Sequence, residues 1–488
     1  SGDIESGSIV TAVYDGTNFQ VTSQLATEGG TPGGSDTQVQ YNSSSAFAGS
    51  AHFTFDGTSA TVANPLFLPD GSASAPALSN TGDTNTGIAF IAADTVGVVT
   101  GGTEQFRFGS NPIHGANKNV LVNGNMQICQ RSTSTSGVGE GDTGYVGPDQ
   151  WYYDESGTTE GVFTISQEDN GGTNGQDLWM KVLCTTEEAL GATSDMIMMM
   201  QRPEAQNCVQ LLDGSSGIAE TTVSADIIIH ADGSSGLSFP VKVAFSIHTQ
   251  DGTGRQCTGD VSITANDTWE RVSVTFPSDS TATFNADNGL GCTFSFSICG
   301  GSARVQPSLT WENDANEYIT SNTDNIADQA NNYIGITNTQ WEVGAVPTSF
   351  AYEYIGTTFD KCQRYFKRIQ KGADVSFGDG WVQGVNDGRI RQRGNTSVPG
   401  PVMRAEPTKS FSAVTDFEVA GWNGGTSRTF YTCDTVLQIS AASEAKPGTF
   451  GMGTYLWTAD VASGPAGDDP VWIQYANNDA YLDFTAEL

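Results

Sequence analysis

The sequence predicts an all-β protein. Runs in which apolar and polar residues alternate recur along the chain, for example Val241–His248, Trp269–Phe276 and Thr293–Ile298. This alternation is typical of strands with one buried face, whereas the spacing of an amphipathic helix is nearly absent. Eight Asp-Gly pairs supply the corners of tight hairpins, because glycine adopts positive φ without steric cost. We expect only two short helices, near Thr323–Ala330 and Thr358–Arg368.

Residues 1–118 differ in composition from the rest of the chain. They are rich in Gly, Ser and Thr, carry no Lys or Arg before Arg107, and contain only short strand phrases such as Val10–Val21. Such phrases cannot bury an apolar face alone, and ordering the backbone costs ~1–2 kcal/mol per residue. Three chains wound around one axis could bury these strands against each other and remove exposed edges. We therefore expect residues 1–26 to end an anchor domain and residues 27–118 to form an intertwined trimeric β shaft; disorder is the alternative.

Residues 119–356 predict a jelly-roll β-sandwich of two sheets, because about eight strand candidates and their loops fill this stretch. We expect Trp151, Trp269 and Trp341 in its core, where aromatic side chains usually pack. The strand candidates are Leu178–Cys184, Asn207–Leu212, Glu220–His230, Val241–Thr249, Trp269–Phe276, Thr293–Ile298 and Tyr333–Val343.

The sequence of residues 357–488 predicts a smaller C-terminal β-sandwich. Short alternating runs again lie between glycine-rich turns. Twelve of the 21 basic residues lie between Lys361 and Lys446, so this module differs electrostatically from the N-terminal region. The strand candidates are Trp381–Gly384, Arg389–Arg393, Ser410–Val414, Ser427–Cys433, Val436–Ile439, Tyr455–Trp457 and Trp472–Tyr475.

The formal net charge of −34 argues against a nucleic-acid partner, because nucleic acids need basic surface. Two explanations of the acidity remain open: solubility through mutual repulsion, and a salt-rich setting that screens the charge. No window approaches the ~18 apolar residues of a membrane span, so we expect no membrane insertion. The chain begins at Ser1 within a strand-like run, and we expect further sequence upstream.

The sequence does not predict an enzyme. His230 and His248 end strand candidates as packed or solvated side chains, and no nucleophile motif accompanies them. Among 55 acidic residues, pairs of carboxylates arise by chance. The eight cysteines lack metal-ligand spacing and predict mostly free, buried thiols, with a disulfide as the alternative. We expect no cofactor: Asp83–Gly87 and Glu312–Asn316 are interpreted as Asx turns, and a structural calcium is the alternative.

Two pairs of phrases bracket the middle of the chain. Asn119–Arg131 (NVLVNGNMQICQR) is followed by Asp149–Asp154 (DQWYYD), and Gln340–Phe350 (QWEVGAVPTSF) runs on into Phe359–Arg368 (FDKCQRYFKR). These phrases resemble bacteriophage tail-fibre proteins. The receptor-binding part of such fibres often starts with NxLxNGxFxIxQR…DRW, and a module often ends with QxExGxxxTxFExR…CQRYY.

The resemblance implies a virion tail fibre, assembled in the host cytoplasm, that mediates adsorption to the host. Residues 80–107 are similar to fibre shaft segments, Trp269–Phe276 to a strand of jelly-roll carbohydrate-binding modules, and Ala480–Leu488 to the terminal strand of tail proteins. The implied partners are further copies of the chain in a homotrimer, other tail or virion proteins at the N-terminal end, and a host surface polysaccharide or protein receptor. A glycan-degrading tailspike depolymerase and a head or virion decoration fibre without a receptor role are the alternatives.

We predict host recognition in residues 357–488, the end farthest from the virion if the N-terminal end faces the particle. Aromatic side chains beside glycine-rich turns can stack on sugar rings, and arginines spaced by two lie on one face of a strand. These arginines could bind an anionic glycan or pair with carboxylates of a neighbouring subunit. The predicted receptor-binding residues are Trp381, Arg389, Arg391, Arg393, Trp422, Tyr455 and Trp457.

Overall fold

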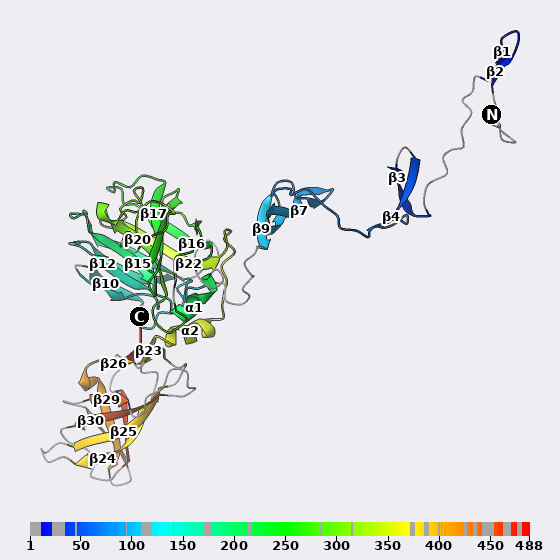
Figure 1. Ribbon diagram of the computed structural model, residues 1–488. Coiled ribbons are helices and arrows are strands. Elements are labelled where there is room, and N and C mark those ends of the chain that lie inside the picture. The colour runs from blue at the N-terminus through cyan, green and yellow to red at the C-terminus, as the bar shows by residue number, and fades with distance from the viewer. Residues whose placement is uncertain are drawn as a thin grey trace. The chain divides into compact units, whose positions relative to one another are not determined.

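The computed structural model is shown as a ribbon in Figure 1. The chain divides into two units, Ser1–Gly109 and Ser110–Leu488, and each is described by itself. For the described residues within 376–384, 390–398, 419–423, 427–432, 437–441, 453–461 and 470–475 the description consists of backbone strands and their register. The structure describes residues 11–21, 35–43, 46–93, 95–108, 119–139, 141–169, 178–212, 217–283, 285–313, 316–370, 376–384, 390–398, 401, 403–405, 407–423, 427–432, 437–441, 453–461, 470–475 and 481–488.

The first unit consists of small antiparallel sheets that follow one another in sequence. Its Asp-Gly pairs form turns, as predicted: the Asp15 carboxylate accepts the backbone N–H groups of Thr17 and Asn18 at 2.8 Å each, and Gly16 has a φ of +94°. The sheets are β1 (Ala12–Tyr14) with β2 (Phe19–Val21), then β3 (Gln38–Ser43), β4 (Ala46–Phe55) and β5 (Ala60–Val62), then β6 (Leu78–Asn80), β7 (Asp83–Ala92), β8 (Thr95–Thr100) and β9 (Thr103–Phe108).

The second unit contains the predicted jelly-roll β-sandwich, with two antiparallel sheets enclosing one core. Figure 1 shows α1 and α2 near the same end of this sandwich. One sheet has the order β10 (Ser134–Gly139), β13 (Val162–Asp169), β14 (Leu178–Thr186), β22 (Tyr333–Val343), β16 (Thr221–His230) and β19 (Glu270–Phe276). The other has the order β11 (Gly144–Tyr145), β12 (Tyr152–Ser156), β15 (Met196–Gln201), β20 (Cys292–Gly300), β17 (Val241–Thr249), β18 (Arg255–Ile263) and β21 (Glu312–Asn313).

The sandwich core is built on large aromatic side chains from both sheets. Trp151 and Trp341 are fully buried, as predicted. The Trp151 ring meets Phe296 edge-on, with the ring centroids 5.9 Å apart. This geometry is a favoured one for aromatic pairs. The seven described cysteines are free thiols and six of them are buried, while Cys433 lies outside the described residues.

The prediction that Trp269 is buried is wrong. Strand β19 begins one residue later, and its core-facing residues alternate from Val272 through Val274 to Phe276. Trp269 therefore falls on the outer side, where it is partly exposed and meets Trp179 edge-on at 5.4 Å. Because side chains in a strand alternate between faces, an aromatic residue at the wrong parity cannot reach the core.

The predicted strand Asn207–Leu212 is instead helical. It forms α1 (Ala205–Cys208) and the 3₁₀ helix η1 (Val209–Leu211). Cys208 and Leu211 are buried at a spacing of three, which places both on one helical face. A strand would have required buried residues at a spacing of two.

The predicted helix at Thr323–Ala330 is absent, and this segment forms turns. The backbone N–H groups of Asp324 and Ile326 donate to the carbonyls of Lys242 and Ile298, so they are used in contacts with other strands. The second predicted helix exists but begins and ends earlier, as α2 (Ile355–Gln363).

The remainder of the second unit has a three-stranded and a seven-stranded antiparallel sheet, consistent with the smaller C-terminal β-sandwich. The 3₁₀ helices η2 (Ser302–Arg304) and η3 (Val414–Asp416) complete the fold; η3 occupies the end of the predicted strand Ser410–Val414. The three-stranded sheet has the order β23 (Phe366–Gln370), β32 (Tyr481–Thr485) and β26 (Thr408–Phe411). The seven-stranded sheet has the order β28 (Ser427–Thr432), β27 (Phe417–Asn423), β31 (Pro470–Tyr475), β24 (Ser376–Gly384), β25 (Ile390–Val398), β30 (Gly453–Val461) and β29 (Leu437–Ala441).

The two tryptophans provide a matched test of core packing. We expect Trp151→Ala to destabilise the sandwich by about 3–5 kcal/mol, because it empties a fully buried site. Trp269→Ala should cost clearly less, since Trp269 is partly exposed. Urea unfolding of both variants measures the difference, and equal losses would contradict the assignment of Trp269 to the outer face.

Candidate functional site

The opening and closing phrases of the sequence meet in the structure through the side chain of Asn119. Its Oδ1 accepts the backbone N–H of Trp341 at 2.9 Å, and its Nδ2 donates to the carbonyl of Thr339 at 2.9 Å. Gly124 lies against the same strand: a Cβ at this position would lie 2.1 Å from the Thr339 oxygen. The glycine of the opening phrase is therefore explained by close backbone packing against β22.

A second set of contacts, here called the joint, holds the C-terminus against the sandwich. Arg131 forms an ion pair with Glu487, and its guanidinium lies 3.6 Å from the centre of the Phe366 ring. Arg368 donates two hydrogen bonds to the carboxylate of Asp483, of 2.8 and 2.7 Å, and also donates to the carbonyl of Arg131. Arg131 of the opening phrase and Arg368 of the closing phrase thus serve as structural connections between modules.

Burial makes Glu487 an unusual carboxylate. Its pKa is raised from 4.5 to about 7, chiefly because the group is buried, and the nearby charge of Asp149 raises it further. The charge and hydrogen bond of Arg131 act in the opposite direction but do not offset the burial. The joint is therefore sensitive to pH near neutrality.

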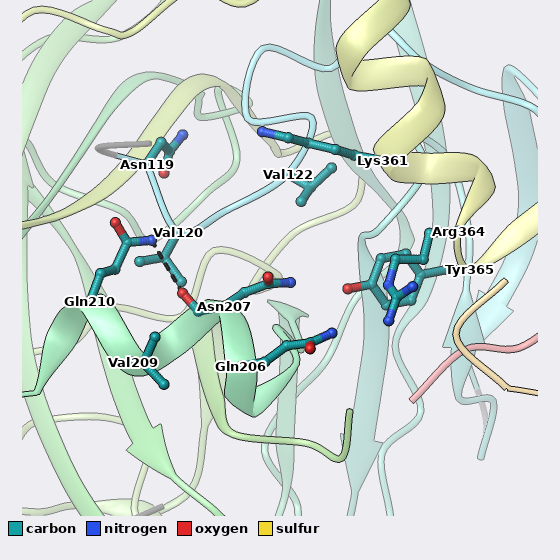
Figure 2. A pocket seen from close by; sticks show the side chains of 10 residues that line it. All are labelled: Asn119, Val120, Val122, Gln206, Asn207, Val209, Gln210, Lys361, Arg364 and Tyr365. Carbon is teal, nitrogen blue, oxygen red and sulfur yellow. Dashed lines mark hydrogen bonds between the residues drawn. The ribbon is translucent and has the colours of Figure 1, made fainter. Parts of the chain in front are cut away.

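A groove lies beside Asn119, between the opening phrase, α1 with η1, and the end of α2 (Figure 2). Its cavity measures about 380 Å³, within the ~300–1,000 Å³ typical of small-molecule sites. We call it the amide groove, because four of its residues carry side-chain amides. The lining residues are Asn119, Val120, Val122, Gln206, Asn207, Val209, Gln210, Lys361, Arg364 and Tyr365.

One wall of the amide groove is organised by the buried carboxylate of Glu204. Arg364 donates to it through Nε at 2.7 Å and Nη2 at 2.9 Å, and Gln206 donates through its side-chain amide. Tyr365 is also buried; its burial and the charge of Glu204 raise its pKa well above the usual range. These mutual hydrogen bonds hold the polar groups of the wall in place before any ligand arrives.

Charges in the amide groove are balanced by neighbouring carboxylates. Arg364 is paired with Glu204, and Lys361 forms an exposed pair with Glu353. In Figure 2 the Lys361 side chain extends from α2 toward Asn119. The lining set contains no Asp or Glu, so these residues do not supply the two carboxylates of a glycosidase.

Sequence reasoning did not find the amide groove. Gln206, Asn207 and Gln210 are spaced by three and four, as on one face of a helix, but Asn207–Leu212 was interpreted as a strand. The helical spacing of these three amide residues was the sequence signal that could have indicated one wall of the groove. It became meaningful only when Asn119 and α2, which are far apart in sequence, came to lie beside it.

The predicted receptor-binding residues lie in the seven-stranded sheet, except Arg389, which lies outside the described residues. Strands β24, β25 and β30 are direct neighbours, whereas β27 is separated from β24 by β31. Five of the predicted residues therefore share three adjacent strands. Trp381 is on β24, Arg391 and Arg393 are on β25, Trp422 is on β27, and Tyr455 and Trp457 are on β30.

The strand register divides these residues between the two faces of the sheet. Trp381 pairs with Arg393, and Arg391, two residues away, shares their face. Trp457 pairs with the residue next to Arg393 and so falls on the other face, together with Tyr455. We call the first side the arginine face. It contains Trp381, Arg391 and Arg393, and counting across β31 adds Trp422.

The histidines and the candidate calcium loops do not form a catalytic or metal-binding site in the described part of the chain. His230 Nδ1 lies 2.8 Å from Asp267 Oδ1, and its ring stacks on Tyr333 at 5.1 Å; His248 is buried. Asp83–Gly87 lies within β7 and is not a loop. Within the described part of the chain, no three His, Cys, Asp or Glu residues come together as metal ligands. No described helix is long and apolar enough to cross a membrane.

Comparison with known proteins gives only distant likeness. No protein-family model and no curated protein matches the chain. Among solved structures, it is similar to the N-terminal CBM22-1–CBM22-2 tandem domain of Paenibacillus barcinonensis Xyn10C, with 9% identity and a TM-score of 0.20. That match covers 74% of this chain and 99% of the other. The assignment of the β-sandwich fold rests on the sheets described above.

The raised pKa of Glu487 predicts a pH dependence of stability. Between pH 4.5 and about 7 the unfolded chain has released this proton while the folded chain retains it, so stability falls as pH rises, by roughly 3 kcal/mol at most. We expect Glu487→Gln to reduce this slope in unfolding measurements from pH 4.5 to 7.5, while Asp149, whose pKa is also raised by burial, retains its own contribution. Glu353→Gln, which alters an exposed pair, should retain it. An unchanged slope in Glu487→Gln would show that another group titrates.

Proposed function

We propose that this chain is a receptor-binding tail fibre of a bacteriophage. In this proposal it forms a homotrimer, contacts other tail or virion proteins through its N-terminal end, and binds a host surface glycan or protein without catalysing a reaction. The bracketing phrases support the family. The structural observation that carries the proposal is the uncovered apolar surface of the first unit.

Fourteen of the 20 large apolar residues exposed in the described chain lie between Val13 and Phe106. Phe19 is 74% exposed and Phe67 is 91% exposed, whereas the buried hydrophobic residues described in this unit are Ala89 and Val99. Covering apolar surface contributes about 25 cal/mol per Å², and small open sheets also leave their edges unpaired. Further copies of the same chain, arranged around a closed symmetry axis, would cover both features.

A smaller apolar patch on the second unit extends this argument. Tyr352, Tyr354, Ile355 and Phe359 are 58%, 90%, 60% and 38% exposed. Tyr352 borders a small cavity that Asn119 also lines, so the patch lies near the start of the described part of this unit. We propose that a second copy of the chain covers it, because copies joined through their first units continue into their second units there.

Recognition of the host is assigned to the C-terminal module. This module carries most of the cations of an acidic chain, and the arginine face gathers two arginines and two tryptophans. Guanidinium groups bind carboxylates and phosphates through paired hydrogen bonds, and indole rings stack on the apolar faces of sugars. Such a face suits an anionic surface polysaccharide.

The trimer is tested by mass and by cross-linking. We expect the purified full chain to have three times the chain mass in analytical ultracentrifugation. Tyr354→Cys should form disulfide-linked dimers under mild oxidation, because in this proposal the patch lies close to the trimer axis, where equivalent residues of the copies meet. Ser273→Cys, exposed on β19, should remain at the parent background. A monomeric mass would overturn the trimer; a trimer without the Tyr354→Cys cross-link would remove only the patch from the contact.

The two faces of the seven-stranded sheet can be compared directly. We expect Trp381→Ala with Arg391→Ala and Arg393→Ala to weaken adsorption to host cells at least roughly tenfold, as for loss of a binding hot spot. Tyr455→Ala with Trp457→Ala should have less effect, since these residues lie on the other face. Both variants should remain trimeric. Parent-like adsorption by the first variant would show that the arginine face is not the receptor site.

A further inference from the structure

We infer that the amide groove of the sandwich is a second ligand site, which binds a neutral, hydroxyl-rich saccharide. The inference goes beyond recognition by the C-terminal module, because the groove is lined by α1, η1, the opening phrase and the C-terminal end of α2, and contains none of the residues of the seven-stranded sheet. Binding there can be measured with purified protein and free sugars. Its outcome is therefore separate from that of cell adsorption.

The first argument is the chemistry of the side chains that face the cavity. A carboxamide offers a donor and an acceptor in one plane, so it can pair with two adjacent sugar hydroxyls. Asn207 and Gln206 are exposed at the groove, and Gln210 is held there by its hydrogen bond of 3.2 Å to the carbonyl of Asn207 (Figure 2). Val209, 41% exposed, adds an apolar surface for the C–H groups of a sugar ring.

The second argument is the rigidity of the frame. Asn119 is fixed by three hydrogen bonds, to Thr339, Leu121 and Trp341. On the opposite side, Glu204 is fully buried beneath Arg364 and Gln206. A site whose polar groups are already ordered loses less entropy when a ligand binds, which favours a small, weakly held molecule such as a sugar.

The third argument concerns charge and selects the class of saccharide. Each cation of the groove already has a carboxylate partner, Arg364 with Glu204 and Lys361 with Glu353. An anionic sugar would have to compete with these pairs and approach a chain with a net charge of −34. A neutral sugar neither competes with the two ion pairs nor is repelled by the net negative charge. It would interact with the amides and with the outer N–H groups of Lys361 and Arg364.

The test uses the full-length protein and four neutral disaccharides: maltose, cellobiose, lactose and N,N′-diacetylchitobiose. Saturation-transfer NMR and calorimetric titration should detect saturable binding of at least one of them. Asn207→Ala with Gln210→Ala should lower its affinity about tenfold or more, while both residues are accessible enough for the fold to be retained. Asn322→Ala, an exposed amide outside the groove lining, should bind as the parent does.

Several outcomes would overturn the inference. One is that no neutral disaccharide binds; another is that the double variant, with an unchanged near-ultraviolet circular dichroism spectrum, binds as the parent does. Tighter binding of digalacturonate than of every neutral sugar would show that the neutral class is wrong. Binding of a deglycosylated host surface protein that Asn207→Ala with Gln210→Ala abolishes, without any sugar binding, would assign the groove to a peptide ligand.

Discussion

Arg368 connects the two ends of the second unit. Its guanidinium holds Asp483 of the C-terminal strand through two hydrogen bonds and reaches the carbonyl of Arg131 in the opening phrase. Side chains of this ion pair are 17% and 9% exposed, so removing one partner would leave the other charge poorly solvated, at a cost of about 3–5 kcal/mol. Arg131 and Glu487 form a second buried pair, but the raised pKa of Glu487 makes its charge depend on pH near neutrality. The final residues of the chain are therefore ordered by the first residues of the sandwich.

The amide groove depends on the same arrangement. Strand β23 follows α2 directly, so fixing β23 at the joint also fixes Lys361, Arg364 and Tyr365 at the end of the helix. The opposite wall is set by Asn119 against β22. The opening and closing phrases, which lie at the two ends of the sandwich in the sequence, thus come together in the structure and line the amide groove. They carry structural contacts first, and the ligand chemistry comes from neighbouring residues such as Asn207.

The two units differ in how much of their apolar surface they bury within a single chain. The sandwich encloses Trp151, Phe245 and Trp341 between two sheets and needs no partner for its core. The first unit has sheets of two to four strands, which leave residues such as Phe47 and Phe67 exposed. A chain that combines a complete module with an incomplete one suits a role in which one part assembles and the other presents a surface. This division is the physical basis of the proposed fibre.

Part of the fold was determined by the sequence alone: the alternating run Trp269–Phe276 predicted β19, which has one buried face, and the Asp-Gly turns followed from the conformational freedom of glycine. Strand β15 (Met196–Gln201) was not predicted, because five of its six residues are apolar and its sequence therefore shows no alternation. The position of Trp269 on the outer face was decided by strand register, and the helical state of Asn207–Leu212 by the burial of Cys208 and Leu211 on one helical face. The amide groove likewise arose only in the tertiary structure, because its walls come from residues near 119, 206 and 364, and no local pattern encodes which distant segments will meet.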